Sequence, residues 1–171
     1  THAQNEALAL SHRIAVMNQG NVEQIDEPSK IYSFPSNRFV ADFIGKISMI
    51  NARVLETAPS HLKLDIAELG EVTTVGKEGT KVGDKGIMAI RPEQVRISHP
   101  SDDSELKNHF LGKVHDFLYV GDVTTYIVEL SNGAYIEALR PNSAPGRAKF
   151  FEVGDAVRVS WRHDAGIFLN D

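Results

Sequence analysis

The pattern of apolar and polar residues changes once along the chain, close to Gly45. Before this position the apolar residues recur at helical spacing. In the segment 37–44 they fall at i, i+1, i+4 and i+5, which is one face of a helix that Gly45 would end. Another helix is predicted between Pro28, a residue favoured in a first turn, and Pro35, which ends it.

The residues before Pro28 predict a further helix and a hairpin. Thr1 and Gln4 have the spacing of a capping box, in which each side chain satisfies a free backbone N–H group of the other. The apolar run 13–17 predicts a strand, 18–20 a turn, and 22–24 the partner strand. This first part of the chain is therefore expected to be α/β.

From residue 51 onward the apolar positions recur with period two, which predicts strands. The expected strands are 51–56, 61–66, 71–75, 85–91, 95–98, 112–120, 124–130, 134–139, 156–161 and 167–169. Asn132-Gly133 predicts a type I′ hairpin turn with positive φ at both residues. Many short strands predict a small barrel or sandwich. The acidic segment 98–105 predicts an exposed linker between two β-rich halves, about 47–98 and 108–171, whose apolar faces need a packing surface.

Composition narrows the class of protein. Hydrophobic residues make up 42% and charged residues 24% of the chain, as in soluble globular domains. We expect no direct membrane insertion, because no apolar run approaches the ~18 residues of a membrane span. The absence of Cys excludes disulfides. A net charge of -5 argues against a nucleic-acid partner, which usually requires a basic face.

Motifs for catalysis and cofactor binding are missing from the sequence. It contains no phosphate-binding G-x-x-x-x-G-K-[ST] motif, and its seven His are scattered, so we predict no metal site and no cofactor site in this chain. One pattern leaves a nucleic-acid alternative open, because cationic and aromatic residues interleave near the end of the chain. They are Arg147, Lys149, Phe150, Phe151, Arg158, Trp161 and Arg162. The alternative is that these aromatics belong to the core.

The first 51 residues resemble a known family in many fixed positions. The string THAQNEALALSHRIAVMNQG is followed by Gln24 and Pro28, then by Tyr32 and Pro35, and then by FVADFIG over 39–45. This order is similar to the ATP-binding subunits of ABC importers, the group that includes polyamine, maltose and iron importers. The details most resemble the polyamine importers, and sugar or iron importers remain alternatives.

The β-rich part carries the resemblance further. The motif Ile90-Arg91-Pro92-Glu93, the segment 118–126, Asn132-Gly133 and Trp161 are similar to the regulatory region of the same subunits. The resemblance implies a transport-associated OB-like (TOBE) fold for residues 47–171. Residues 1–46 would then be the C-terminal remnant of the nucleotide-binding domain, and the chain a C-terminal fragment.

The resemblance also implies roles. His2 matches the switch histidine that contacts the γ-phosphate of ATP, so ATP and Mg²⁺ would bind in the full-length parent, an ATPase, while this chain alone is expected to be inactive. Arg91, Pro92, Glu93 and Trp161 are the candidates for regulation and dimer contacts. The partners implied are a second copy and the membrane permease subunits, at the cytoplasmic face of the inner membrane.

Three positions depart from the family pattern, which has Asp, Asp and Gly where this chain has Ala3, His12 and Asp26. Asp tolerates positive φ better than most residues, so the turn at Asp26 is expected to survive. An alternative function from another class is a small oxyanion-sensing module, with Arg91, Lys85 and backbone N–H groups as donors.

Overall fold

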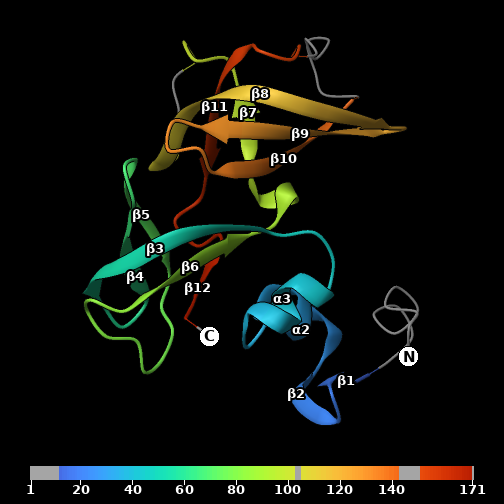
Figure 1. Ribbon diagram of the computed structural model, residues 1–171, viewed down its shortest axis with the longest axis vertical. Helices are drawn as coiled ribbons and strands as arrows, with labels where there is room; N and C mark the ends of the chain where they lie inside the picture. The colour runs from blue at the N-terminus through green and yellow to red at the C-terminus, as the bar shows by residue number, and fades with distance from the viewer. Residues whose placement is uncertain (1–11, 103–104, 143–150, 171) are drawn as a thin grey trace. The chain divides into compact units, whose positions relative to one another are not determined.

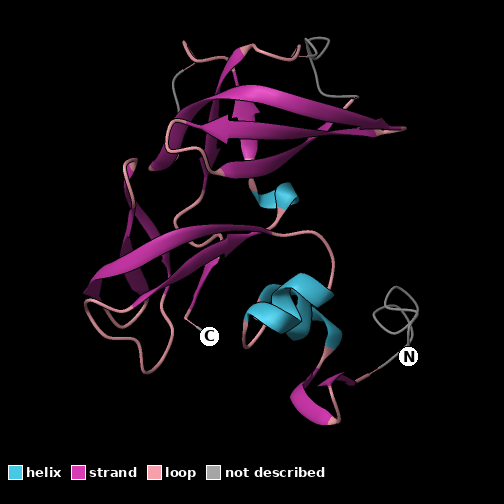
Figure 2. Cartoon of the chain, in the orientation of Figure 1, coloured by secondary structure: helices cyan, strands magenta, loops and turns pink. Residues whose placement is uncertain are grey.

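The structure is a computed structural model that describes residues 12–102, 105–142 and 151–170. The described part of the chain is mainly β, as predicted, and its larger sheets are curled (Figures 1 and 2). It divides into two compact units, one formed by residues 48–168 and the other by 1–47 with 169–171. The predicted capping box and first helix, with Ala3, lie outside the described residues.

The first unit begins with a tight hairpin of β1 (Ile14–Asn18) and β2 (Asn21–Asp26). Asn18 pairs with Asn21, and the two loop residues Gln19 and Gly20 have φ of 49° and 81°. Positive φ at both loop positions is the mark of a type I′ turn, whose twist matches that of the strands. Asp26 has no positive φ; it lies in β2, and its Oδ1 accepts the N–H of Glu27 at 3.0 Å.

Two short helices follow, α2 (Pro28–Ser33) and α3 (Arg38–Phe43). Asn37 caps α3, because its side-chain oxygen accepts the N–H of Val40 at 3.0 Å. Gln24 holds the loop between the helices to β2: it donates to Phe34 O at 3.2 Å and accepts from Ser36 N at 2.9 Å. The buried apolar side chains of this unit include Val16, Ile31, Val40, Ala41 and Ile44.

The second unit contains two five-stranded antiparallel sheets. The first has the order β12-β6-β3-β4-β5. Its strands are β3 (Ser48–Thr57), β4 (His61–Ile66), β5 (Gly70–Val75), β6 (Lys85–Ile90) and β12 (Ile167–Leu169). The second has the order β10-β9-β8-β11-β7. Its strands are β7 (Arg96–Ser98), β8 (Asn108–Val120), β9 (Val123–Leu130), β10 (Tyr135–Pro141) and β11 (Ala156–Trp161). A short 3-10 turn, η1 (Pro92–Gln94), precedes β7.

All ten strands predicted after residue 51 are present, although the turn type expected at Asn132-Gly133 is wrong. Only Gly133 has positive φ there, 84°, and its N–H donates to Leu130 O at 2.9 Å. Leu130 N–H donates to Ala134 O at 2.8 Å, which makes the loop three residues long. A turn closed by a left-handed Gly is the usual form of such a loop. The Asn132 side chain instead accepts the N–H of Ala134 at 3.0 Å and donates to Ala67 O at 3.0 Å.

Both sheets of the second unit contribute to one hydrophobic core. Leu64 and Met88 come from the first sheet, Val128 and Val159 from the second, and Trp161 lies fully buried among them. The two β-rich halves therefore supply each other's packing surface. The apolar faces of both halves thus have the packing surface that the sequence pattern requires.

Candidate functional site

An open cavity of the second unit lies between the two edges of one curled sheet. β7 and β10 are the outer strands of the sheet β10-β9-β8-β11-β7, and the curl brings them into contact with each other. Between them is a cleft of about 650 Å³. We call it the edge cleft; it is lined by 93–97, 105–107, 139–141, Arg162 and His163.

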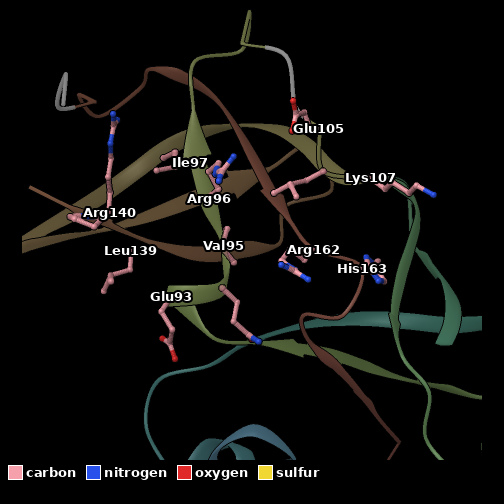
Figure 3. Close-up of a pocket in the computed structure, with 13 residues that line it drawn as sticks. Glu93, Val95, Arg96, Ile97, Glu105, Lys107, Leu139, Arg140, Arg162 and His163 are labelled. Atoms are coloured by element: carbon pink, nitrogen blue, oxygen red, sulfur yellow. The ribbon is translucent and has the colours of Figure 1, made fainter. Parts of the chain in front are cut away.

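The edge cleft is cationic although the chain as a whole is acidic. Four cationic side chains line it, against two carboxylates: Arg96, Lys107, Arg140 and Arg162 against Glu93 and Glu105. Figure 3 shows Arg96 in the middle, with Arg162, His163 and Lys107 on one side of it and Leu139 and Arg140 on the other. The cleft is therefore suited to an anionic ligand.

Arg162 is already engaged by an acid. Its Nε donates to Asp164 Oδ1 at 2.9 Å and its Nη2 to Asp164 Oδ2 at 3.2 Å, a two-pronged pair. The hydrogen bond from Arg162 holds the pKa of Asp164 below its usual value of 3.8. The positive charge that Arg162 gives to the edge cleft is correspondingly reduced.

Arg140 lies over an aromatic ring. Its guanidinium carbon is 5.2 Å from the centre of the Phe151 ring, which is within the range of a cation–π contact. Phe151 in turn meets Tyr126 edge to face at 5.6 Å, and its N–H donates to Tyr126 Oη at 3.3 Å. These contacts fix the last residues of β10 on their side of the edge cleft.

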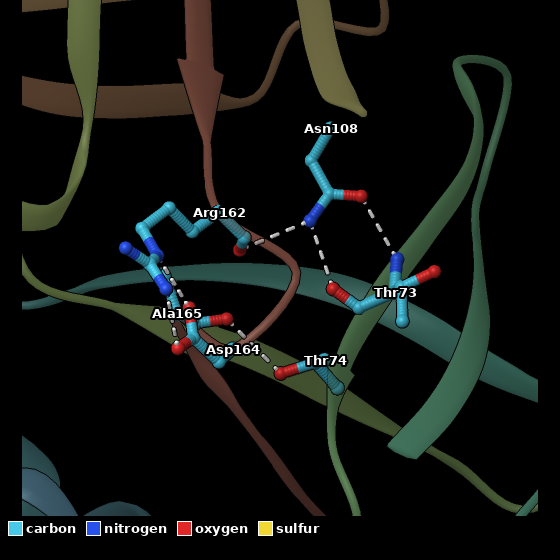
Figure 4. Close-up of polar contacts among 6 residues, drawn as sticks. All are labelled: Thr73, Thr74, Asn108, Arg162, Asp164 and Ala165. Atoms are coloured by element: carbon cyan, nitrogen blue, oxygen red, sulfur yellow. Dashed lines mark hydrogen bonds and ion pairs between the residues drawn. The ribbon is translucent and has the colours of Figure 1, made fainter. Parts of the chain in front are cut away.

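The buried amide side chain of Asn108 joins the backbone at Arg162 to the other sheet. Asn108, 2% exposed, exchanges two hydrogen bonds with the backbone of Thr73 in β5 and donates to Arg162 O at 3.3 Å (Figure 4). Thr74 Oγ1 adds bonds to Gly166 O at 2.7 Å and Ala165 O at 3.2 Å. The segment 162–166 is therefore attached to β5 by side chains from both sheets.

The structure separates the four predicted regulatory residues by exposure. Arg91 and Pro92 are buried at the start of η1, where Arg91 N–H donates to Gln94 Oε1 at 3.1 Å. Glu93 is exposed and lines the edge cleft. Trp161 is 0% exposed, so it has no surface to offer a partner. Their regulatory role stays a prediction.

Other sequence candidates are dispersed. Lys85 and Arg91 stand at opposite ends of β6, about 20 Å apart at 3.3 Å per residue, so they do not converge on one oxyanion. Trp161 and Phe151 belong to the hydrophobic core, which was the alternative to nucleic-acid binding, and they are not available to stack on bases. His2 lies outside the described residues.

The sequence did not single out Arg96 or Lys107 as site residues. Arg96 is the exposed residue of an alternating strand, and Lys107 stands in a polar connection, so neither is distinguished by its local pattern. Only the approach of β7 to β10 brings them into one cleft. In the described part of the chain, no helix has the length and apolar character needed to cross a membrane.

A family model and a solved structure both support the fold described above. The TOBE domain family model matches residues 88–169, which covers η1 and every strand from β7 onward. A solved structure of the cytoplasmic molybdate-binding protein ModG, with molybdate bound, superposes with a TM-score of 0.60. It covers 72% of this chain and 95% of that protein at 13% identity, so it supports the fold alone.

Curated relatives match over the whole chain. The spermidine/putrescine import ATP-binding protein PotA of Nitrosospira multiformis is 81% identical over 171 residues, 100% of this chain and 47% of that protein. The proteins of the same description from Nitrosomonas europaea (61% identity, 99% of this chain, 47% of that protein) and Pseudomonas aeruginosa (52%, 97% and 46%) follow. The chain thus spans about half the length of these relatives. Its residues 88–169 match the TOBE domain family, and its whole length matches part of the spermidine/putrescine import ATP-binding proteins.

Proposed function

We propose that this chain is the regulatory part of an ATP-hydrolysing subunit of an ABC importer, and that the importer carries polyamines such as spermidine and putrescine. The observation that carries the proposal is the 81% identity over all 171 residues with a spermidine/putrescine import ATP-binding protein. The fold supports the proposal, because a small barrel with one continuous core is a rigid body that can transmit a signal without doing chemistry itself.

In the full-length protein, residues 1–46 would belong to the nucleotide-binding domain and 47–171 to the regulatory domain. ATP and Mg²⁺ would bind mostly to groups that this sequence does not contain, and His2 would contact the γ-phosphate. An imidazole there can stabilise the charge that develops on the phosphate during hydrolysis. The subunit would work with membrane permease subunits at the cytoplasmic face of the inner membrane.

Pairing with a second copy through the regulatory domain is part of the proposal. The distal end of β8 supports it, because consecutive apolar side chains are exposed on both faces of the strand there. Leu118 is 55% exposed, Val120 53% and Phe117 40%. Exposed apolar surface of this kind is typical of an interaction site, and a two-fold axis would bury the same strip on both copies.

Oxyanion sensing by Lys85 and Arg91 has less support, because the two cations stand at opposite ends of one strand. A transport assay distinguishes a polyamine importer from an importer of another substrate. The full-length protein, expressed with its permease partners in a bacterium that lacks polyamine uptake, should restore uptake of labelled spermidine and not of maltose or iron. Uptake of a sugar or iron alone would overturn the substrate assignment.

A substitution tests the assigned role of His2. In the full-length protein, His2→Ala should lower the rate of ATP hydrolysis by about 10²-fold while ATP still binds, because positioning of the reacting groups contributes that order of magnitude. His12→Ala is the matched control and should leave the rate unchanged. An unchanged rate in His2→Ala would refute the assigned role.

A further inference from the structure

A row of polar residues crosses three strands on the outer face of the second sheet. Ser160 in the middle strand, β11, pairs with Arg96 of β7 on one side and with His109 of β8 on the other. Residues that pair across strands lie on the same face of a sheet. Because the next residue along β11, Trp161, belongs to the core, the row lies on the face turned away from the core.

Arg158, two residues before Ser160, is a half-buried cation on the same face. Its Nη1 donates to His109 Nδ1 at 2.8 Å, and its Nη2 donates to Pro100 O at 3.0 Å. Its Nε is buried and has no hydrogen-bond partner. Among the described residues, no carboxylate forms an ion pair with Arg158. A charge that is partly removed from water requires a counter-charge, and the protein does not supply one here.

The contact with Arg158 determines which nitrogen of His109 carries the hydrogen. A guanidinium has only donors, so Nδ1 of His109 accepts, and the hydrogen of the neutral ring is then on Nε2. His109 is exposed, so this N–H can donate to a ligand. Arg96 is exposed too, and in the described part of the chain its side chain has no hydrogen bond or ion pair. Both neighbours of Ser160 therefore have donors that can turn toward one ligand.

Ser160 supplies a second unused polar group. It is 1% exposed, and its hydroxyl has no hydrogen-bond partner. Buried hydroxyl groups nearly always have a partner, so an unused one indicates a group that binds beside it. The exposed side chain of Arg96 can move away without losing a contact, which opens access to the Ser160 hydroxyl.

The outer face of these three strands carries no acidic residue next to the row. The side chains that share this face are Arg96 and Ser98 of β7, Ala156, Arg158 and Ser160 of β11, and His109, Leu111 and Lys113 of β8. Arg96 also borders the edge cleft, but neither Glu93 nor Glu105 forms an ion pair with it. The groups around Ser160 are thus donors and cations, which suits an anion.

The spacing of the strands limits the size of the ligand. The backbones at Arg96 and His109 are two strand spacings apart, about 9–10 Å, with Ser160 between them. Side chains that reach inward from both positions can contact one small anion at the same time. A phosphate group fits best, because it carries about -1.5 to -2 charges at neutral pH and three acceptor oxygens, more than a carboxylate has.

We propose that this face binds the phosphate group of a small ligand, either inorganic phosphate or a phosphate monoester, between Arg96 and His109. The phosphate accepts hydrogen bonds from Arg96, from His109 Nε2 and from the Ser160 hydroxyl, and Arg158 provides the fixed counter-charge. We call this the Ser160 site. It is separate from ATP hydrolysis and does not depend on the transported substrate, so the inference does not rest on the proposed function.

NMR titration of the ¹⁵N-labelled full chain with inorganic phosphate tests the proposal, at constant pH and constant ionic strength. The amide signals of Arg96, His109 and Ser160 should shift together and saturate. Equal shifts with chloride alone would show charge screening and overturn the site. Glycerol 3-phosphate is the second probe: saturable binding of either compound supports the site, and the tighter one identifies the ligand. If a single-stranded oligonucleotide shifts these signals and neither small compound does, the assignment to a small ligand is wrong.

Ser160→Ala separates ligand binding from a structural role. Because the hydroxyl has no partner in the protein, the variant should be at least as stable as the native chain in urea without phosphate. Its affinity for phosphate should nevertheless fall about tenfold, which corresponds to about 1.4 kcal/mol. Unchanged affinity would exclude the site, and a loss of stability without phosphate would show that the hydroxyl has a structural role instead.

Arg96→Gln tests the exposed cation, with Arg53→Gln as its matched control. Arg53 is an exposed Arg in β3 of the other sheet, so the charge change is the same. Arg96→Gln should weaken phosphate binding about tenfold, and Arg53→Gln should leave it unchanged. Saturating phosphate should also raise the urea midpoint of the native chain more than that of Arg96→Gln, because a ligand that binds only the folded state stabilises it. Equal effects of the two variants would mean that phosphate binds elsewhere.

Discussion

Asn108 and Thr73 exchange a reciprocal pair of hydrogen bonds between the two sheets. Asn108 Oδ1 accepts Thr73 N–H at 2.9 Å, and Asn108 Nδ2 donates to Thr73 O at 2.8 Å. An amide side chain that matches one backbone N–H and C=O in this way imitates a strand partner. Since Asn108 begins β8 and Thr73 lies in β5, the pair joins the two β-rich halves.

Asn108→Ala should therefore destabilise the second unit. The substitution leaves the N–H and C=O of Thr73 without partners in a largely buried place, at about 1–3 kcal/mol for each group that water does not reach. We expect a loss of about 2–4 kcal/mol in the free energy of unfolding, measured by urea denaturation. Lys107→Ala, at the exposed neighbouring position, is the control and should change little. A loss no larger than that of Lys107→Ala would mean that water replaces the amide.

Gly112→Ala should also destabilise the protein, by overpacking. Gly112 lies in β8 between β9 and β11, and a Cβ there would meet Glu129 O and Val128 Cγ1 at 2.7 Å each. Neither the strand backbone nor a buried Val can move away freely, so we expect a cost of about 1–3 kcal/mol. Leu111→Ala, next along the strand and exposed, is the comparison in the same denaturation assay. Equal stability of the two variants would show that β9 shifts without cost.

Strands such as β4 and β11 could be predicted because buried and less buried positions alternate along most of their length, and this alternation is preserved in the sequence. β4, β11 and β12 begin and end at the predicted residues. The turn at Asn132-Gly133 could not be predicted in type, because Asn132 uses its side chain to reach Ala67, a contact between distant parts of the chain. Tertiary contacts of this kind override a local preference for a turn type.

The edge cleft was beyond sequence reasoning for a similar reason. Its lining comes from segments that are far apart in the chain, and only the curl of the sheet brings β7 to β10. Arg96 and Lys107 each look like an ordinary exposed cation. By contrast, Trp161 was predicted from the family resemblance to contact a partner, and its side chain is buried in the core. Pattern identifies which residues are apolar, and the fold decides which of them remain at the surface.

Acid should weaken the pair formed by Arg162 and Asp164. The hydrogen bond from Arg162 lowers the pKa of Asp164, so the pair is fully formed above the unfolded-state pKa of about 3.9 and its contribution is lost as pH falls through the lower folded-state pKa. NMR titration of the Asp164 carboxyl should give a pKa below 3.8 in the native chain and a higher one in Arg162→Gln. Arg96→Gln removes a cleft cation that does not contact Asp164, and it should not raise that pKa to the same extent.

The distal end of β8 gives the last prediction, which concerns pairing of two copies. If the exposed strip that contains Phe117, Leu118 and Val120 is the dimer contact, a charge placed within it would be buried against the same charge of the second copy. Leu118→Asp should then raise the dimer dissociation constant by at least about tenfold, since each 1.4 kcal/mol corresponds to tenfold. The measurement is sedimentation equilibrium over a range of chain concentrations.

A control at another exposed apolar position separates this contact from general stickiness. Val82→Asp changes a residue that is 64% exposed in the loop before β6, and it should leave dimerisation unchanged. A native chain that stays monomeric at high micromolar concentration would show that the regulatory domain does not dimerise by itself. Equal weakening by Val82→Asp and Leu118→Asp would place the contact elsewhere, because a specific two-fold interface buries one strip of surface and leaves distant exposed residues in water.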